Sequence, residues 1–112
     1  MKIQTRTEGG THVLQLTGKL AQPEGTTALR RVFRDLETAG RVRVVLDLRN
    51  VPWMDSSGLG EIVSCYARAQ DRGGDVKLVL PEKPLSAFTF THLEELFEIF
   101  VTPEEAVAAF GS

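Results

Sequence analysis

The stretch Arg43–Gly60, RVVLDLRNVPWMDSSGLG, determines the fold of this chain. Its first part, Val44–Leu48, is a short, almost continuous apolar run rich in β-branched residues, which is typical of a strand buried on both faces, as in a parallel sheet. The segment Asn50–Pro52 ends this strand, because proline lacks a backbone donor and holds the preceding residue extended. Apolar residues at helical spacing begin at Leu59, so the stretch predicts a strand, a polar turn and a helix.

The polar turn Asp55-Ser56-Ser57-Gly58 lies where the predicted strand passes into the helix. Unpaired N–H groups and the positive end of the helix dipole gather at such a point and favour an anion. A serine in this turn could therefore carry a phosphate into a preformed site. The simpler alternative is a helix cap with a tight turn, since Ser and Asp are preferred capping residues.

The residues around the turn give two further expectations. Gly58 and Gly60 are poor helix formers in a first helical turn, so we expect them to leave the turn bare for a phosphate or another protein. Trp53 is interpreted as a core residue, with an exposed aromatic contact as the alternative. The helix face opposite the apolar stripe is either solvated or a partner surface, and it is expected to carry Glu61, Ser64, Cys65, Arg68 and Arg72.

The composition of the 112 residues, with 42% hydrophobic and 25% charged, is that of one ordinary globular domain spanning 1–112. A formal net charge of −2 and the lack of a Lys/Arg-rich run argue against nucleic acid as the main partner. Cys65 is the only cysteine, so no intrachain disulfide can form. No signal peptide is visible, and no apolar run approaches the roughly 20 residues of a membrane span. We expect a cytoplasmic protein, not bound to a membrane and monomeric when free.

The rest of the chain predicts alternating strands and helices. The last helix has a strong start, with Thr102 as cap, Pro103 at the first helical position and Glu105 closing a capping box. The fold class is therefore α/β, with a mostly parallel four- to five-stranded sheet, an N-terminal β-hairpin and about four helices. The other predicted elements are strands at Lys2–Glu8, His12–Thr17, Val76–Leu80 and Leu96–Val101, and helices from Thr26 or Thr27 (as cap) to Gly40, from about Ser57 to Arg72, and at Leu85–His92.

Catalytic chemistry is not indicated by the sequence. A serine nucleophile needs a base, and the two histidines, His12 and His92, lie in no recognisable motif. The G-x-S-x-G elbow, the phosphate-binding loop and the dinucleotide fingerprint are all missing. One cysteine and two scattered histidines indicate no metal site. We expect a protein without enzymatic activity and without a cofactor.

Taken together, these segments match a known pattern. The main segment is VVLDLRNVPWMDSSGLGEIVSCYARAQDRGGDVKLVL (44–80), supported by HVLQLTGKL (12–20) and LFEIFVTPEEAVAAF (96–110). With these segments the chain resembles the STAS domain family, specifically the single-domain bacterial anti-sigma factor antagonists, over almost its whole length.

The resemblance implies a partner-switching mechanism. The unphosphorylated antagonist binds an anti-sigma factor that is also a serine kinase of the histidine-kinase-like ATPase type, and the sigma factor is released. The kinase then phosphorylates a serine of the turn, the complex separates, and a serine phosphatase resets the protein. Matched by position, the phosphorylated residue is Ser56. The resemblance also implies that Asp55 presents the turn and that Ser57 holds it and caps the helix. The adjoining residues Gly58, Leu59, Gly60 and Glu61 belong to the expected partner-binding surface.

Two positions depart from the family pattern. Many relatives carry an aspartate facing the serine loop where this chain has Ala21, and a small or apolar residue where it has Glu61. Glu61 is expected to oppose a phosphate or to reshape the partner surface. Two alternatives remain open: a STAS-domain subunit of an ABC-type lipid transport complex, and a nucleotide-binding domain.

Overall fold

The computed structural model describes residues 1–81 and 87–111 and contains a five-stranded sheet in the order β1-β2-β3-β4-β5. β1 and β2 form the predicted hairpin and are antiparallel, whereas β2 to β5 are parallel to one another. This mixed sheet confirms the predicted α/β class. The elements are β1 Lys2–Glu8, β2 Thr11–Thr17, α1 Glu24–Thr38, β3 Arg43–Asn50, α2 Ser56–Asp71, β4 Asp75–Val79, α3 Ala87–Leu96, β5 Ile99–Phe100 and α4 Pro103–Ala109.

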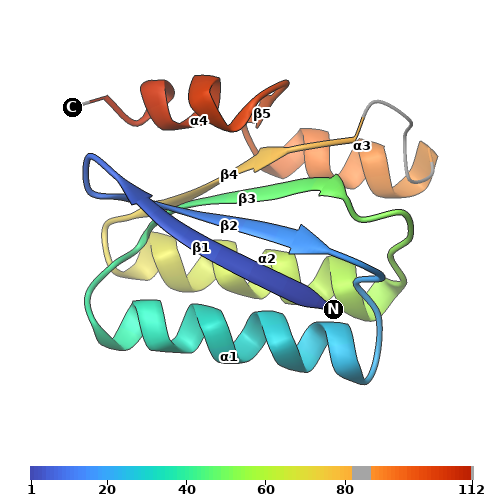
Figure 1. The fold of residues 1–112 in the computed structure, drawn as a ribbon. Helices are drawn as coiled ribbons and strands as arrows, with labels where there is room; N and C mark the ends of the chain where they lie inside the picture. The colour runs from blue at the N-terminus through green and yellow to red at the C-terminus, as the bar shows by residue number, and fades with distance from the viewer. Residues whose placement is uncertain (82–86, 112) are drawn as a thin grey trace.

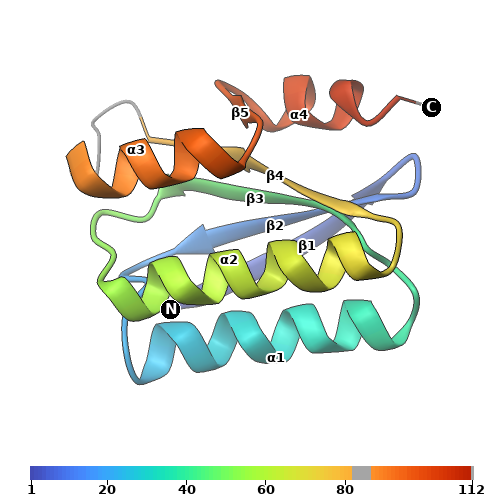
Figure 2. The ribbon, with the colours of Figure 1, turned by 180° about the vertical axis from the view of Figure 1, so that it is seen from behind.

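Helices cover both faces of the sheet (Figure 1). α1 and α2 lie side by side below it, and α4 lies above, over the part formed by β3 and β4. The view from behind in Figure 2 shows α3 on the β4–β5 side of α2. There the ring of Phe97, the residue after α3, meets the ring of Tyr66 in α2 edge-on, with centroids 4.9 Å apart.

β3 is the centre of the core, as its apolar run predicts. Val44 and Leu46 are fully buried in the larger cluster, which includes Phe33 of α1 and Ile62 of α2. Val45 points the other way, into a smaller cluster under α4. Alternate side chains along one strand therefore enter two different cores, which is why the strand lacks an apolar–polar alternation.

The smaller core under α4 is closed by Phe110. Its ring lies 4.6 Å from the ammonium nitrogen of Lys77 and 5.2 Å from the guanidinium carbon of Arg43, within the range of cation–π attraction. The guanidinium of Arg43 also donates to the backbone carbonyls of Phe110 and Gly111. These contacts hold the C-terminal end of α4 against β3 and β4.

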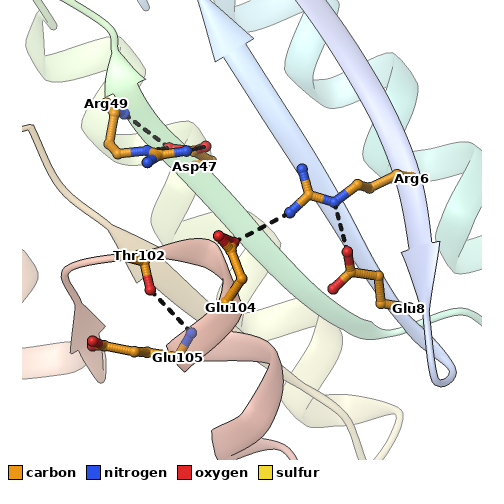
Figure 3. Close-up of polar contacts among 7 residues, drawn as sticks. All are labelled: Arg6, Glu8, Asp47, Arg49, Thr102, Glu104 and Glu105. Carbon is orange, nitrogen blue, oxygen red and sulfur yellow. Dashed lines mark hydrogen bonds and ion pairs between the residues drawn. The ribbon is translucent and has the colours of Figure 1, made fainter.

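Charged side chains link the upper face of the sheet to α4 (Figure 3). Asp47 is buried in β3, and Arg49 meets both of its carboxylate oxygens, at 3.0 and 2.9 Å. Arg6 of β1 pairs with Glu8 at 3.0 Å and reaches Glu104 of α4 at 3.6 Å. At the start of α4 the Thr102 hydroxyl accepts the backbone N–H of Glu105 at 3.2 Å, which confirms the predicted cap.

Several predicted boundaries are wrong. α1 begins at Glu24, before the threonines proposed as caps. The hydroxyl of Thr26 instead donates to the carbonyl of Pro23 from within the helix, at 3.4 Å, and Thr27 lies one residue further in. The last helical residue of α3 is Leu96 rather than His92, which leaves β5 only two residues long. The predicted start of α3, at Leu85, lies outside the described residues.

Other predicted ends are correct. Gly40 adopts the left-handed conformation, with φ of 74°, and Arg41 N–H closes the turn on the carbonyl of Leu36 at 2.8 Å. α2 begins and ends within one residue of its predicted bounds. In the part of the chain that the structure describes, no helix is both long and apolar enough to cross a membrane.

Candidate functional site

The serine turn lies after the carboxyl end of β3, where α2 begins (Figure 1). Asp55 has an extended backbone, and its Oδ1 accepts the N–H of Gly58 at 2.8 Å, so Asp55 is the helix cap. The prediction that Ser57 caps α2 is wrong, because both serines already lie within the helix. Ser56 is the first helical residue and is exposed to solvent, whereas Ser57 is half-buried.

A second loop, between β2 and α1, supports the turn. Leu20 forms a parallel bridge with Met54, in which Leu20 N–H donates to the Trp53 carbonyl at 3.0 Å and Asp55 N–H to the Leu20 carbonyl at 3.4 Å. The other carboxylate oxygen of Asp55, Oδ2, accepts the N–H of Gln22 at 3.2 Å. One carboxylate thus holds the start of α2 and the β2–α1 loop together.

The two glycines of the turn have different surroundings. A Cβ on Gly58 would overlap the backbone carbonyl of Leu20, and it would lie 2.8 Å from Cγ of Met54. The space beside Gly58 is therefore filled by the β2–α1 loop of this chain. The expectation that Gly58 opens the turn to another molecule is wrong. Gly60 has nothing within 4 Å of its Cβ position and is exposed. Only Gly60 leaves room for an approaching partner.

Trp53 is 51% exposed, so the prediction that it is a core residue is wrong. Around the bridge between the two loops the side chains alternate as in a strand. Met54 is 7% exposed and points inward, so its neighbour Trp53 points outward. The β-like pairing of these loops has no signal in the local sequence.

The side of α2 that faces α1 also differs from the prediction. Glu61 is 7% exposed, and its carboxylate meets the guanidinium of Arg30 in α1 at 2.9 Å. Cys65 is buried, and burial is the main reason why its pKa is raised to about 12. Both were expected on the exposed face. The residues that α2 exposes are instead Ser56, Gly60, Val63, Ala67, Gln70 and Asp71.

The two histidines lie on other elements than the serine turn. His12 pairs with Val44 at the opening of β2, so it lies at the opposite end of the strands from the serine turn. His92 lies on α3 and is exposed. Across 1–81 and 87–111, no group of three or more acidic, histidine or cysteine side chains is placed to hold a metal ion. What the turn offers is an exposed hydroxyl at a positive helix end, beside one carboxylate.

Residues 2–106 match the family model of the STAS domain, so the chain belongs to the STAS domain family. Among curated proteins it is 26% identical over 76 residues to the anti-sigma F factor antagonist of Paenibacillus polymyxa. That match covers 68% of this chain and 65% of the relative, so less than two thirds of the relative's length is spanned.

Solved structures agree on the fold. A candidate anti-sigma factor antagonist from Thermotoga maritima is 25% identical, with a TM-score of 0.84, over 96% of this chain and 92% of that one. SpoIIAA in its unphosphorylated form is 20% identical, with a TM-score of 0.79, over 97% of each chain. The phosphorylated form of the Bacillus protein SpoIIAA is 22% identical, with a TM-score of 0.74, over 97% and 99%. At 20% and 22% identity, the likeness to SpoIIAA shows the fold alone.

Proposed function

We propose that this protein is an anti-sigma factor antagonist that is switched off by phosphorylation of Ser56. The observation that carries the proposal is the exposed hydroxyl of Ser56 at the first position of α2, on a turn that Asp55 holds in place. The names of the relatives from Paenibacillus polymyxa and Thermotoga maritima support the same function.

In this proposal the unphosphorylated protein binds an anti-sigma factor, which is a serine kinase of the histidine-kinase-like ATPase type, and the sigma factor is released. Oγ of Ser56 then attacks the γ-phosphorus of ATP. A new O–P bond forms, the bond between the γ-phosphorus and the bridging oxygen breaks, and ADP leaves. The hydroxyl proton passes to a base of the kinase, because both carboxylate oxygens of the neighbouring Asp55 already accept backbone N–H groups. A serine phosphatase hydrolyses the phosphoserine and restores the binding form.

The charge at the turn explains how one phosphate separates the complex. Phosphorylation adds about −1.5 to −2 charges at neutral pH, next to the carboxylate of Asp55. In the free protein, water and the positive end of α2 stabilise that charge. In a tight interface the same charge must be desolvated against the kinase. A loss of about 3 kcal/mol weakens binding more than a hundredfold.

The neighbouring residues have distinct parts in this proposal. Asp55 and Gly58 fix the turn on the β2–α1 loop, and Ser57 supports it from its half-buried position. Leu59 and Gly60 form the surface next to Ser56 that the kinase contacts. The buried Glu61 acts through Arg30, whose side chain is 49% exposed and is the charge that a partner would meet there.

Phosphorylation by the cognate kinase tests the site. The wild-type protein should take up one phosphate from ATP and Ser56→Ala none, whereas Ser57→Ala should still end with one phosphate even if the loss of its support slows the reaction. Equal phosphate on wild type and Ser56→Ala would refute the assignment. Ser56→Glu should bind the kinase at least tenfold more weakly than wild type, and equal affinity would contradict the electrostatic switch.

A pull-down from native cell extract with wild type and Ser56→Glu as baits distinguishes this function from transport. A histidine-kinase-like ATPase retained by wild type alone supports the antagonist. An ABC transporter ATPase retained by both baits would favour a subunit of a lipid transport complex instead. The proposal includes a cytoplasmic location and a monomeric free state, and sedimentation of the purified protein tests the second of these.

A further inference from the structure

A groove of about 480 Å³ lies beside the serine turn, between the β2–α1 loop and the loop that follows β3. Trp53 lines it from the β3 side, and Ala21 and Pro23 line it from the β2–α1 loop. Its walls therefore include an aromatic ring, a proline ring and a methyl group. The groove is large enough to hold a single side chain of another protein.

The exposure of the large apolar side chain of Trp53 in this groove requires an explanation. It is 51% exposed, although Met54, the next residue, is buried, as is Val51 two positions before it. Among the side chains whose burial is described, those of 1–81 and 92–111, it is also the only aromatic one among the large hydrophobic residues that are exposed. A tryptophan in such a place is typical of the few residues that dominate the energy of a protein–protein interface.

The groove and Ser56 belong to one rigid unit. The carbonyl of Trp53 accepts the N–H of Leu20, and the carboxylate of Asp55 bonds to Gln22 on one side and to the start of α2 on the other. Trp53 precedes Ser56 by only three residues. A protein that takes the Ser56 hydroxyl into its active site therefore comes close to the groove.

The charges around the groove indicate what it accepts. Glu24 also lines the groove, but its side chain is 80% exposed, so its carboxylate remains solvated. Lys19, on the same lining, adds a positive charge, and Ala21 adds none. Because this carboxylate is solvated and a lysine lies nearby, the groove with its Trp53 and Pro23 rings favours an apolar side chain over a cationic one.

We propose that the groove between Trp53 and Pro23 is a docking pocket for an apolar side chain of the kinase that phosphorylates Ser56. This inference rests on the proposed function and adds a second contact to it, away from the reacting hydroxyl. The pocket contributes to affinity and does not take part in phosphoryl transfer.

The test uses the purified kinase that phosphorylates the wild-type protein, with the antagonist variant as its substrate. Trp53→Ala should raise the KM for the antagonist and the Kd of the complex at least tenfold, while kcat stays within twofold. Trp53→Phe should restore most of the affinity. Ala21→Leu, which fills the groove and leaves Trp53 in place, should weaken binding in the same way. Val101→Ala, which removes an exposed apolar side chain of the β5–α4 connection, should change nothing.

The outcomes separate this inference from the function on which it rests. If the kinase phosphorylates Ser56 with unchanged KM for both Trp53→Ala and Ala21→Leu, the docking pocket is refuted and the switch stands. If no kinase phosphorylates Ser56 in the wild-type protein, both are refuted. Circular dichroism and thermal unfolding of each variant show whether a loss of binding arises from a loss of folding. If Trp53→Ala does not fold, the binding of Trp53→Phe and Ala21→Leu decides whether the docking pocket exists.

Discussion

At the scale of single residues, Asp55 determines the shape of the serine turn. Its two carboxylate oxygens accept backbone N–H groups from two different segments, at Gly58 and at Gln22. Replacing a capping side chain by alanine typically costs about 0.5–2 kcal/mol, and here a second hydrogen bond is lost as well. We expect Asp55→Ala to lower the free energy of unfolding by about 2 kcal/mol in urea titrations.

The matched control is Asp55→Asn. Asparagine keeps an oxygen for the helix cap but presents an amide to the second N–H group, so its cost should be smaller than that of alanine. Equal stability of wild type and Asp55→Ala would show that the carboxylate does not hold the two loops together.

The ion pair between Arg30 and Glu61 gives a second prediction at this scale. Removing the arginine leaves a carboxylate that is 7% exposed without its partner, which is costlier than removing both charges. We expect Arg30→Ala to lower the free energy of unfolding by about 1–2 kcal/mol. The double variant Arg30→Ala/Glu61→Val should regain most of that loss. Thermal and urea unfolding of both single variants and the double variant provide a double-mutant cycle. Strictly additive losses of stability would show that the two side chains do not interact.

At the scale of elements, the first turn of α2 offers a matched pair of glycines. Gly60→Ala places a methyl group in open space on a helix, so it should stabilise the protein by about 0.5–1 kcal/mol. Gly58→Ala forces the start of α2 away from the Leu20 carbonyl, and overpacking of this kind costs about 1–3 kcal/mol. The urea concentration at the unfolding midpoint should rise for Gly60→Ala and fall for Gly58→Ala. A rise for both variants would refute the close packing of Gly58 against the Leu20 carbonyl.

The elements themselves could largely be predicted from the sequence, because each has a local signal. The apolar run at Val44–Leu48, the cap at Thr102 and the terminal glycine at Gly40 all act over a few residues. The errors concern features that depend on distant segments. The exposure of Trp53 follows from pairing with the β2–α1 loop, and the burial of Glu61 follows from Arg30, 31 positions earlier in the chain.

The candidate site was predicted in part for the same reason. The position of Ser56 at the start of α2 follows from the local order of strand, polar turn and helix. The roles of its neighbours depend on the β2–α1 loop, which no spacing within the turn reveals. The local pattern therefore predicts the position of the serine turn and leaves its capping residue open, the family resemblance implies the wrong cap, Ser57, and no local pattern predicts the groove beside Trp53.

At the scale of the whole molecule, His12 links stability to pH. Burial, with a smaller contribution from the positive charge of Arg41, lowers the pKa of His12 from its ordinary value of 6.5. Its Nδ1 lies 3.1 Å from the hydroxyl of Thr7. The unfolded chain therefore binds the proton more tightly, so stability is complete above pH 6.5 and falls as the pH drops below it.

The variant His12→Asn keeps a hydrogen-bonding group for Thr7 but does not titrate in this range. The difference in free energy of unfolding between wild type and His12→Asn should therefore change between pH 7 and pH 5, with wild type losing more. Urea titrations across that interval measure it. A difference that stays constant with pH would show that His12 is not responsible.

The bonds that join the serine turn to the β2–α1 loop also have a consequence for the time course of association. Because the turn is already fixed in the free protein, its encounter with the kinase proposed above requires no prior rearrangement on this side. The observed association rate should then rise in proportion to kinase concentration and show no plateau. In the cell, the speed of the response would be limited by collision and by dissociation of the complex, not by a slow change of shape in this protein.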